Sequence, residues 1–469
     1  MNWNQEEEEE YQLSLSRFEA MLKTNKVFFF DSEEFENIIF HYLDIGKSNL
    51  AKRALKLGLE QHPKSVGLKL VQVEMLVYEN KFDLAEKMLN ELYEIEPANE
   101  EIYIQKANIY SKRGNHVKAV ELLEIALKYT DDYADVYSMI GMEYLFMDDL
   151  EKAKENFMSC LKEDNEDYSA LYNIVYCFDF LEQHKEAIEF LNGFIDDNPY
   201  SEVAWHQLGR QHYALKEYEL SVRAFDYAVV IDEFFLGAYM EKAKALEKLH
   251  RFEEAIVCYN QTLELEDPTA FAYMRIGKCY EKLQQKGLAL KFFRKALAED
   301  PILEKGWLAI IDLYAKEQNY KRALGYVNKA LDIDGENEQY WRRFASLNYA
   351  LENYEEAYRG YEKSILCGSL DIDVSLMFAD MNMTLEKYEE AIQVLVQALE
   401  IHPDNFEIEY RLSGLHFVLG NHSSGVFHLS NALMISFESH GLFAELFPDV
   451  YKEELVQKLI KKYQDKNNI

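Results

Sequence analysis

Small and large apolar residues recur along most of the chain with a period of 34 residues. The series begins at Ala51, Ala85, Ala119, Ala153 and Ala187, and the same spacing continues at Ser221, Ala255, Ala289, Ala323, Ala357, Ala391 and Gly425. The residue four places after each small one is always apolar or aromatic, as at Leu55, Phe157 and Phe293. A fixed period of this length is typical of repeat architectures. It indicates a frame from Ser32 to Ser439 that is divided into twelve units.

The pattern inside one unit predicts two helices. Between residues 270 and 303, apolar or small residues recur at three- and four-residue spacing on either side of Gln284-Gln285, namely Tyr273, Ile276, Gly277, Tyr280, Leu288, Ala289, Phe292 and Phe293. Five of the seven prolines occupy frame position 32, where they end the second helix: Pro63, Pro97, Pro199, Pro301 and Pro403. A short break makes the two helices antiparallel, and one pair cannot bury its apolar face alone. The chain is therefore expected to be all-α, with stacked helix pairs.

These residues resemble the tetratricopeptide repeat (TPR), whose pattern is W-xx-L-G-xx-Y, then A-xxx-F, then P. The match in one unit is carried by Tyr273, Ile276, Gly277, Tyr280, Ala289, Phe293 and Pro301. The resemblance implies an α-solenoid of antiparallel helix pairs that forms a right-handed TPR superhelix. It implies twelve tandem repeats over 32–439, which start at residues 32, 66, 100, 134, 168, 202, 236, 270, 304, 338, 372 and 406. The array is also similar to uncharacterised cytoplasmic bacterial TPR proteins.

One repeat and both ends depart from this pattern. The second repeat has Lys69 and Gln72 at frame positions 4 and 7, so its first helix is expected to be shifted or tilted. Residues 1–10 are predicted to be an acidic tail, 11–31 an N-terminal capping helix, and 440–469 a C-terminal capping helix that Asp449 caps. Within the last segment, Phe443, Leu446 and Phe447 form either a ligand-like motif or a buried cluster under the cap, and burial is favoured.

Charge and composition limit the partners. With 84 acidic and 50 basic residues the net charge is −34, which argues against duplex nucleic acid and against anionic lipid as ligands. No apolar run is long enough for a membrane helix, so membrane insertion is not expected, and the N-terminus lacks a secretory signal. Five scattered cysteines without a CxxC pair favour small core residues in a reduced, cytoplasmic setting.

No catalytic motif is present. The sequence has no GxxxxGK, no HExxH and no GxSxG, and no GxGxxG follows a strand. His416, His422 and His428 recur by six, which places them on different helical faces, so a metal site is not indicated. Glu253-Glu254 and similar pairs open second helices, where they favour the helix dipole. Neither an enzyme activity nor a cofactor is therefore expected.

The resemblance implies that first helices line a concave groove and that frame positions 2, 5, 9 and 12 point inward. On that mapping the candidate groove residues are Met142, Leu145, Tyr172, Tyr176, His206, Arg210, Tyr213, Met240, Lys244 and Lys278, with Arg275 beside them. Repeats four and five carry 4 basic and 16 acidic residues, whereas repeats six to eight carry 14 and 16. One hypothesis is a partner segment that is apolar at one end and acidic at the other. The alternative is an ordinary groove lining with no single partner.

Two functions follow from this. The favoured one is a non-catalytic scaffold or adaptor that binds an extended or helical protein segment in the groove. The alternative is a self-associating structural subunit of a larger complex, as TPR subunits of the anaphase-promoting complex are; a role as an enzyme or enzyme regulator ranks third. TPR adaptors of chaperone tails use a carboxylate clamp with lysine at position 5 and asparagine at position 9. Here Asn108 stands at position 9 but Ile104 at position 5, so chaperone C-terminal tails are not expected partners.

Overall fold

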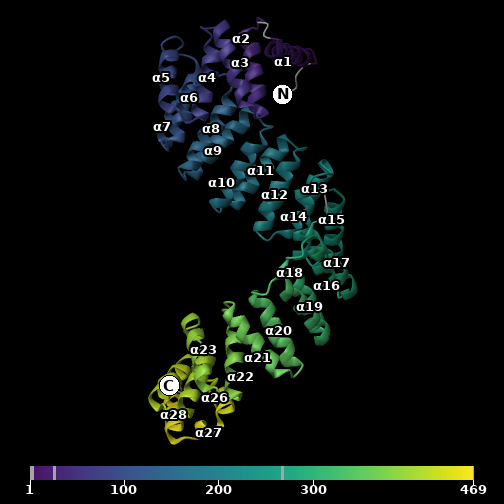
Figure 1. Ribbon diagram of the computed structural model, residues 1–469, viewed down its shortest axis with the longest axis vertical. Helices are drawn as coiled ribbons and strands as arrows, with labels where there is room; N and C mark the ends of the chain where they lie inside the picture. The colour runs from purple at the N-terminus through teal and green to yellow at the C-terminus, as the bar shows by residue number, and fades with distance from the viewer. Residues whose placement is uncertain (1–4, 25–27, 266–268, 468–469) are drawn as a thin grey trace. The chain divides into compact units, whose positions relative to one another are not determined.

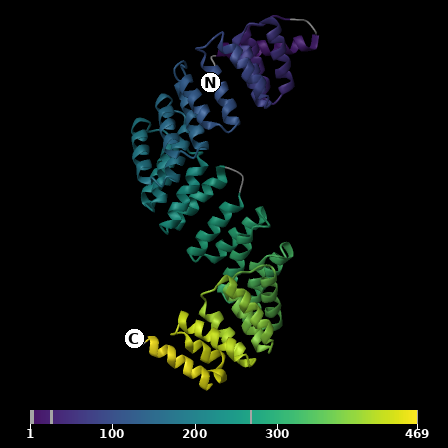
Figure 2. The same ribbon diagram turned by 90° about the vertical axis from the view of Figure 1, so that its left-hand side faces the viewer.

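The computed structural model describes residues 5–24, 28–265 and 269–467, and every regular element within these ranges is a helix. The chain forms two compact units, Met1–Ala238 and Tyr239–Ile469. Within each unit, consecutive helices pack side by side in pairs (Figure 1), and the perpendicular view shows the same pairing (Figure 2). The expected all-α solenoid of helix pairs is confirmed. No helix in the described ranges is long and apolar enough to cross a membrane.

Unit 1 begins with a single helix and continues with pairs. Its helices are α1 (Gln5–Thr24), α2 (Ser32–Asp44), α3 (Ser48–Gln61), α4 (Val66–Tyr78), α5 (Phe82–Tyr93), α6 (Glu100–Lys112), α7 (His116–Ala126), α8 (Tyr133–Phe146), α9 (Leu150–Glu163), α10 (Tyr168–Phe180), α11 (His184–Asp197), α12 (Glu202–Ala214) and α13 (Tyr218–Ile231).

The boundary between the units falls inside α14 (Leu236–Lys248). The helices that follow are α15 (Phe252–Leu265), α16 (Ala270–Lys282), α17 (Lys286–Glu299), α18 (Glu304–Lys316), α19 (Tyr320–Ile333), α20 (Glu338–Ala350), α21 (Tyr354–Leu366), α22 (Ile372–Thr384), α23 (Tyr388–Ile401), α24 (Phe406–Val418), α25 (His422–Ile435), α26 (His440–Leu446), α27 (Pro448–Tyr451) and α28 (Glu454–Asn467).

Polar caps set where first helices begin. The hydroxyl of Ser65 accepts the backbone N–H of Leu68 at 3.2 Å before α4, and Asp167 accepts the N–H of Ala170 at 2.9 Å before α10. Such caps satisfy N–H groups that have no partner inside the helix. The helix α4 is thus a regular helix that begins at Val66, and the shift along the sequence that Lys69 and Gln72 led us to expect is not observed.

Every pair from α2–α3 to α24–α25 turns through a residue with positive φ at frame position 15. Three of these are glycines, Gly46, Gly114 and Gly420, and nine are not: Asn80, Asp148, Glu182, Lys216, His250, Gln284, Gln318, Glu352 and Glu386. The next residue donates its N–H to the carbonyl five residues back, as Gln285 does to Tyr280 at 2.9 Å. This bond closes a Schellman turn, which satisfies carbonyls at the helix end.

Small residues on the first helix make room for aromatic rings on the second. A Cβ atom placed on Gly277 of α16 would lie 2.5 Å from the ring of Phe293 on α17. Gly209 stands in the same relation to Phe225, at 2.6 Å, and all four of these residues are buried. The small residue of the second helix, Ala289, is also fully buried. The closest approach of the two helices therefore depends on volume matching between these positions.

Both ends differ from the expected caps. α1 begins at Gln5, so residues 5–10, which we expected in an acidic tail, belong to the helix that buries Phe18. The C-terminal segment forms three helices rather than one, because Pro448 lacks the N–H needed to continue α26. Asp449 consequently lies in α27 and does not cap α28, which begins at Glu454.

The C-terminal aromatic cluster is packed, as favoured above. Phe443 is fully buried and Phe447 is 8% exposed, in the cluster that also contains Val456 and Ile460 of α28. The ring of Phe447 fills the space beside Gly414, where a Cβ atom would clash with it. At the other end, two consecutive phenylalanines differ: Phe30 is buried and Phe29 is 65% exposed.

The volume match between Gly277 and Phe293 predicts a change of sign in a mutant cycle. Gly277→Ala should lower the free energy of unfolding by about 1–3 kcal/mol, because the new methyl group overpacks against the ring. In a Phe293→Leu background the same change should raise it by up to about 1 kcal/mol, because alanine is the better helix former once the clash is gone. Urea unfolding of the four proteins tests this, and the same sign in both backgrounds would contradict the packing described.

Candidate functional site

Two neighbouring first helices in unit 1 expose large apolar side chains. Met142 and Phe146 of α8 are 38% and 60% exposed, and Tyr172, Tyr176 and Phe180 of α10 are 43%, 46% and 64% exposed. These residues are spaced by four within each helix and thus share a helical face. We call them the aromatic face. The rings of Tyr176 and Phe180 pack against each other, with centroids 4.5 Å apart.

The sequence predicted three residues of this face and missed two. Met142, Tyr172 and Tyr176 are exposed as expected, whereas Phe146 and Phe180 occupy frame position 13, which the family rule does not include. The missed signal was the i+4 spacing from Met142 and Tyr176. Leu145 is half-buried against the core that α8 shares with α10.

Three further predicted residues of unit 1 lie on α12 and differ in exposure. His206 is only 9% exposed, and its ring packs against Phe225 and Phe235 with centroids 5.5 and 4.9 Å away. These rings leave little of His206 exposed to a ligand, although its frame position led us to expect it in the groove. Arg210 is exposed and lies 3.5 Å from Asp179, and Tyr213 is half-buried against Tyr218.

The other four predicted residues belong to unit 2 and are described by themselves. Met240, Lys244 and Lys278 are half-buried, and Lys244 pairs with Glu241 at 2.7 Å. Arg275 instead points into the protein: its guanidinium lies 2.7 Å from Glu247 and 3.2 Å from the hydroxyl of Tyr259. Arg275, which we expected beside the groove, is thus already held by a carboxylate and by a buried tyrosine.

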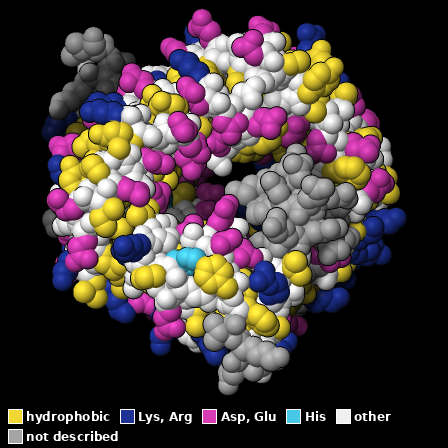
Figure 3. All heavy atoms as spheres, turned by 90° about the horizontal axis from the view of Figure 1, so that it is seen from above, with side chains coloured by type: hydrophobic (Ala, Val, Ile, Leu, Met, Phe, Trp, Pro, Cys, Tyr) yellow, Lys and Arg dark blue, Asp and Glu magenta, His cyan; other side chains and the backbone are white. Residues whose placement is uncertain are grey.

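Acidic side chains crowd the first helices at the start of unit 1. Burial raises the pKa of Glu74 on α4, of Glu101 on α6 and of Asp135 on α8, and a neighbouring carboxylate adds to each shift. Patches of Asp and Glu among hydrophobic side chains are also visible on the face in Figure 3. Like charges at close range disfavour a further anion. An acidic ligand segment is therefore disfavoured beside these helices.

A pocket of about 800 Å³ lies in unit 2, where we expected no site. Its walls include Tyr349, Tyr354 and Tyr358 on one side and Met377 and Met381 on the other. Tyr349 and Tyr354 are 43% and 55% exposed. The inward positions inferred from the family include Tyr349, at frame position 12, so the same rule could have found this pocket.

The charged groups around this pocket are largely matched. Asp380 accepts two hydrogen bonds from Arg411 of α24, at 2.7 and 2.8 Å, and Arg411 is 7% exposed. Lys387 lies 4.6 Å above the ring of Tyr358, in the geometry of a cation–π contact. The pocket therefore offers mainly apolar and aromatic contacts.

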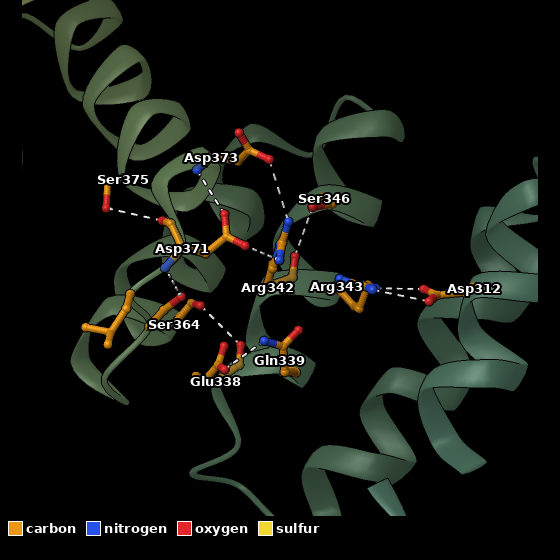
Figure 4. A network of polar contacts seen from close by, with 12 residues as sticks. Asp312, Glu338, Gln339, Arg342, Arg343, Ser346, Ser364, Asp371, Asp373 and Ser375 are labelled. Carbon is orange, nitrogen blue, oxygen red and sulfur yellow. Dashed lines mark hydrogen bonds and ion pairs between the residues drawn. The ribbon is translucent and has the colours of Figure 1, made fainter. Parts of the chain in front are cut away.

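Ion pairs between an arginine and an aspartate, like that of Arg411 with Asp380, also join other first helices of unit 2. Figure 4 shows Arg343 of α20 reaching Asp312 of α18, at 2.7 and 3.2 Å, while the adjacent Arg342 turns toward Asp371 and Asp373 near the start of α22. Planar, two-point pairs of this type fix geometry as well as charge. They hold successive first helices in register.

The cysteines and histidines show no reactive arrangement. Burial raises the pKa of the Cys160 and Cys279 thiols to about 12, which keeps them protonated and unreactive. Contrary to the expected separation, His416 and His428 stack across α24 and α25, with centroids 5.4 Å apart and ring planes at 4°. Among the described residues, no group of three or more His, Cys, Asp or Glu side chains could hold a metal ion.

Profiles of the tetratricopeptide repeat family match residues 76–142, 134–167, 240–301 and 372–405. Anaphase-promoting complex subunit 3 of Schizosaccharomyces pombe is 24% identical over 170 residues, which are 36% of this chain and 26% of that protein. The DnaJ homolog subfamily C member 7 homolog of the same yeast is 23% identical over 198 residues, which are 42% of this chain and 37% of that protein. This chain thus spans well under half the length of these relatives.

Several solved structures are similar over parts of the chain. The MamA protein is 23% identical and covers 37% of this chain and 94% of its own, with a TM-score of 0.33. The anaphase-promoting complex hetero-tetramer Cut9-Hcn1 is 13% identical and covers 97% and 94%, with a TM-score of 0.32. Both TM-scores lie below 0.5, so the helix pairs of the structure itself define the fold.

The stacked histidines predict a pH dependence of stability. Burial, and then the neighbouring His428, lower the pKa of His416 below its ordinary value of about 6.5, and its Nδ1 atom is buried without a hydrogen-bond partner. The unfolded chain therefore binds this proton more readily, so stability is present above about pH 6.5 and is lost as pH falls below it. His416→Phe removes the titration. The unfolding midpoint of the parent should fall relative to that of the variant between pH 7.5 and 5.5, and a constant difference would contradict this.

Proposed function

The chain is a tetratricopeptide repeat protein, and on this premise we propose that it is a protein-interaction scaffold whose first helices bind an extended or helical segment of a partner. The aromatic face carries the proposal. Five large apolar side chains stand exposed on α8 and α10, between 38% and 64%. Clustered exposed apolar groups mark interaction surfaces. Tyrosine and phenylalanine lose little rotamer entropy on binding, so they suit such a surface.

The chemistry of the surroundings supports an apolar segment as the ligand of this face. The carboxylates of Glu101 and Asp135 on nearby first helices disfavour acidic residues in the ligand there. In unit 2, Lys244 and Lys278 would suit an acidic portion of a partner, as the sequence led us to expect. Arg210 at the edge of α12 would suit one too.

The proposal involves no catalysis and no cofactor. TPR scaffolds in general are not catalysts, and the thiols are kept protonated by burial. The ligands proposed are proteins rather than nucleic acid, because the chain carries a net charge of −34. Chaperone C-terminal tails are left out of the proposal because Ile104 replaces the lysine of a carboxylate clamp. A cytoplasmic location remains a prediction.

A second candidate is a self-associating structural subunit of a larger complex. It is favoured by the relative that is named as subunit 3 of the anaphase-promoting complex. Size-exclusion chromatography with light scattering separates the two candidates. A monomer near 55.2 kDa at micromolar concentration supports the scaffold, and a stable oligomer supports the structural subunit.

Tyr172→Ala combined with Tyr176→Ala should weaken partner capture at least tenfold, because anchoring aromatic residues at an interface commonly contribute about 2 kcal/mol or more each. Stability should change little, because both side chains are exposed. The measurement is a quantitative pull-down from the native cell, with folding checked by circular dichroism.

The matched control is Tyr78→Ala combined with Tyr200→Ala. These two tyrosines also belong to unit 1 and are 81% and 82% exposed, but they lie outside the aromatic face. The control protein should capture partners like the parent. Equal capture by all three proteins would place the binding surface elsewhere.

A further inference from the structure

The first helix of the second pair carries polar residues at two positions where the other pairs hold at least one large apolar residue. In the other eleven repeats, at least one of frame positions 4 and 7 holds a large apolar or aromatic residue, such as Trp205 or Trp307. The indole N–H groups of these two tryptophans donate to the carbonyl oxygens of Pro199 and Pro301. In α4 both positions are polar, as Lys69 and Gln72. The helix keeps its regular geometry, so the consequence of this substitution is a change of surface and not of backbone.

Two adjoining hollows lie beside α4, and Gln72 lines both of them. One, of about 270 Å³, lies between the end of α3, α4 and α5, and the other, of about 400 Å³, lies between α3 and α4. They share Leu59 and Gln72, so they form one groove along α4. Figure 1 shows α4 between α3 and α5. We call this the α4 groove.

The walls of the α4 groove are mostly apolar. Leu59 of α3, Met88 of α5 and Ile95 after α5 face it, and Ile95 is 59% exposed. Met75 and Leu76 of α4 line its second half. An apolar groove between two helices is the usual receptor for one face of an amphipathic helix.

The floor of the groove carries a cation that has no partner. Lys69 is half-buried, and among the described residues its ammonium group makes no ion pair or hydrogen bond. Other nearby carboxylates are engaged or solvated. Glu79 is held by Lys52 and Lys81, which lower its pKa to about 2, and Glu91 on the opposite wall is exposed to water. A half-buried charge is stabilised when an opposite charge is brought to it.

We propose that the α4 groove is a docking site for an amphipathic helix of a partner protein that places an aspartate or glutamate beside Lys69. The apolar walls supply contact area, and the single unpaired cation selects for an acidic residue within the apolar stripe of the ligand. This surface shares no residue with the aromatic face, so the two can be tested independently.

Synthetic helical peptides test the charge selection directly. The probes are three fluorescein-labelled 15-residue peptides with leucine at i, i+3, i+4 and i+7 and with Glu, Gln or Lys at one position inside that stripe. Fluorescence anisotropy with the full chain should give at least tenfold tighter binding of the Glu peptide than of the Lys peptide. Lys69→Glu should reverse this order.

Two control proteins make the result specific. Lys87→Glu, on an exposed part of α5 outside the groove, makes the same change of charge and should keep the parent's order. Lys69→Leu with Gln72→Leu should fold, melt at a higher temperature and lose the preference for Glu over Lys. An unchanged order in Lys69→Glu, or no binding of any peptide to the parent, would overturn the proposal. A concentration-dependent dimer that Lys69→Glu abolishes would overturn it in favour of a second copy of the chain.

Discussion

The whole array depends on one contact, the place where the two helices of a pair come closest. There, frame position 8 of the first helix meets frame position 24 of the second, and their volumes compensate. Gly141, Gly209 and Gly277 face phenylalanine rings, and a Cβ atom placed on Gly277 would lie only 2.5 Å from the ring of Phe293. Where the first position grows to Val175 or Ile311, the second shrinks to Leu191 or Val327, and all of these are buried. Such partial compensation of volume lets different side chains fill the same contact between the two helices.

Once that separation is fixed, the remaining positions are free to vary from pair to pair. In unit 1 this freedom appears as the aromatic face on α8 and α10 and as the polar residues Lys69 and Gln72 of the α4 groove. In unit 2 it appears as arginine ties such as Arg343 to Asp312 and as the tyrosine-lined pocket. A repeat core thus supports several unlike surfaces, because stacking involves only neighbours.

The sequence was sufficient for the fold because its strongest signals are local and repeated. Helix periodicity, the prolines at frame position 32 and the spacing of the small residues each act within one or two repeats. It was weaker at the ends, where Pro448 divides the expected single cap and where α1 begins earlier than Tyr11. Propensity alone does not say whether acidic residues before a helix stay outside it.

The site could be predicted only in part, because exposure depends on neighbours that a frame position does not specify. Met142, Tyr172 and Tyr176 are exposed as their positions suggest. His206 stands at the same position as Tyr172 but is enclosed by phenylalanine rings, one of them from the loop that leads into α14. The stacking of His416 on His428 joins two helices, so no spacing within one helix could reveal it.

The left-handed residue between the helices of each pair has a consequence for how such a chain can change in length. It recurs every 34 residues from Gly46 to Gly420, and the bond that closes each turn is the same, as from Asn115 to Tyr110 and from Asn319 to Tyr314. Genetic exchange between two such turns would join backbones of matching geometry. A whole 34-residue repeat could then be gained or lost in one recombination event, while the backbone on either side kept its conformation. Nine of the twelve turn residues are not glycine, so this joint tolerates sequence drift as well.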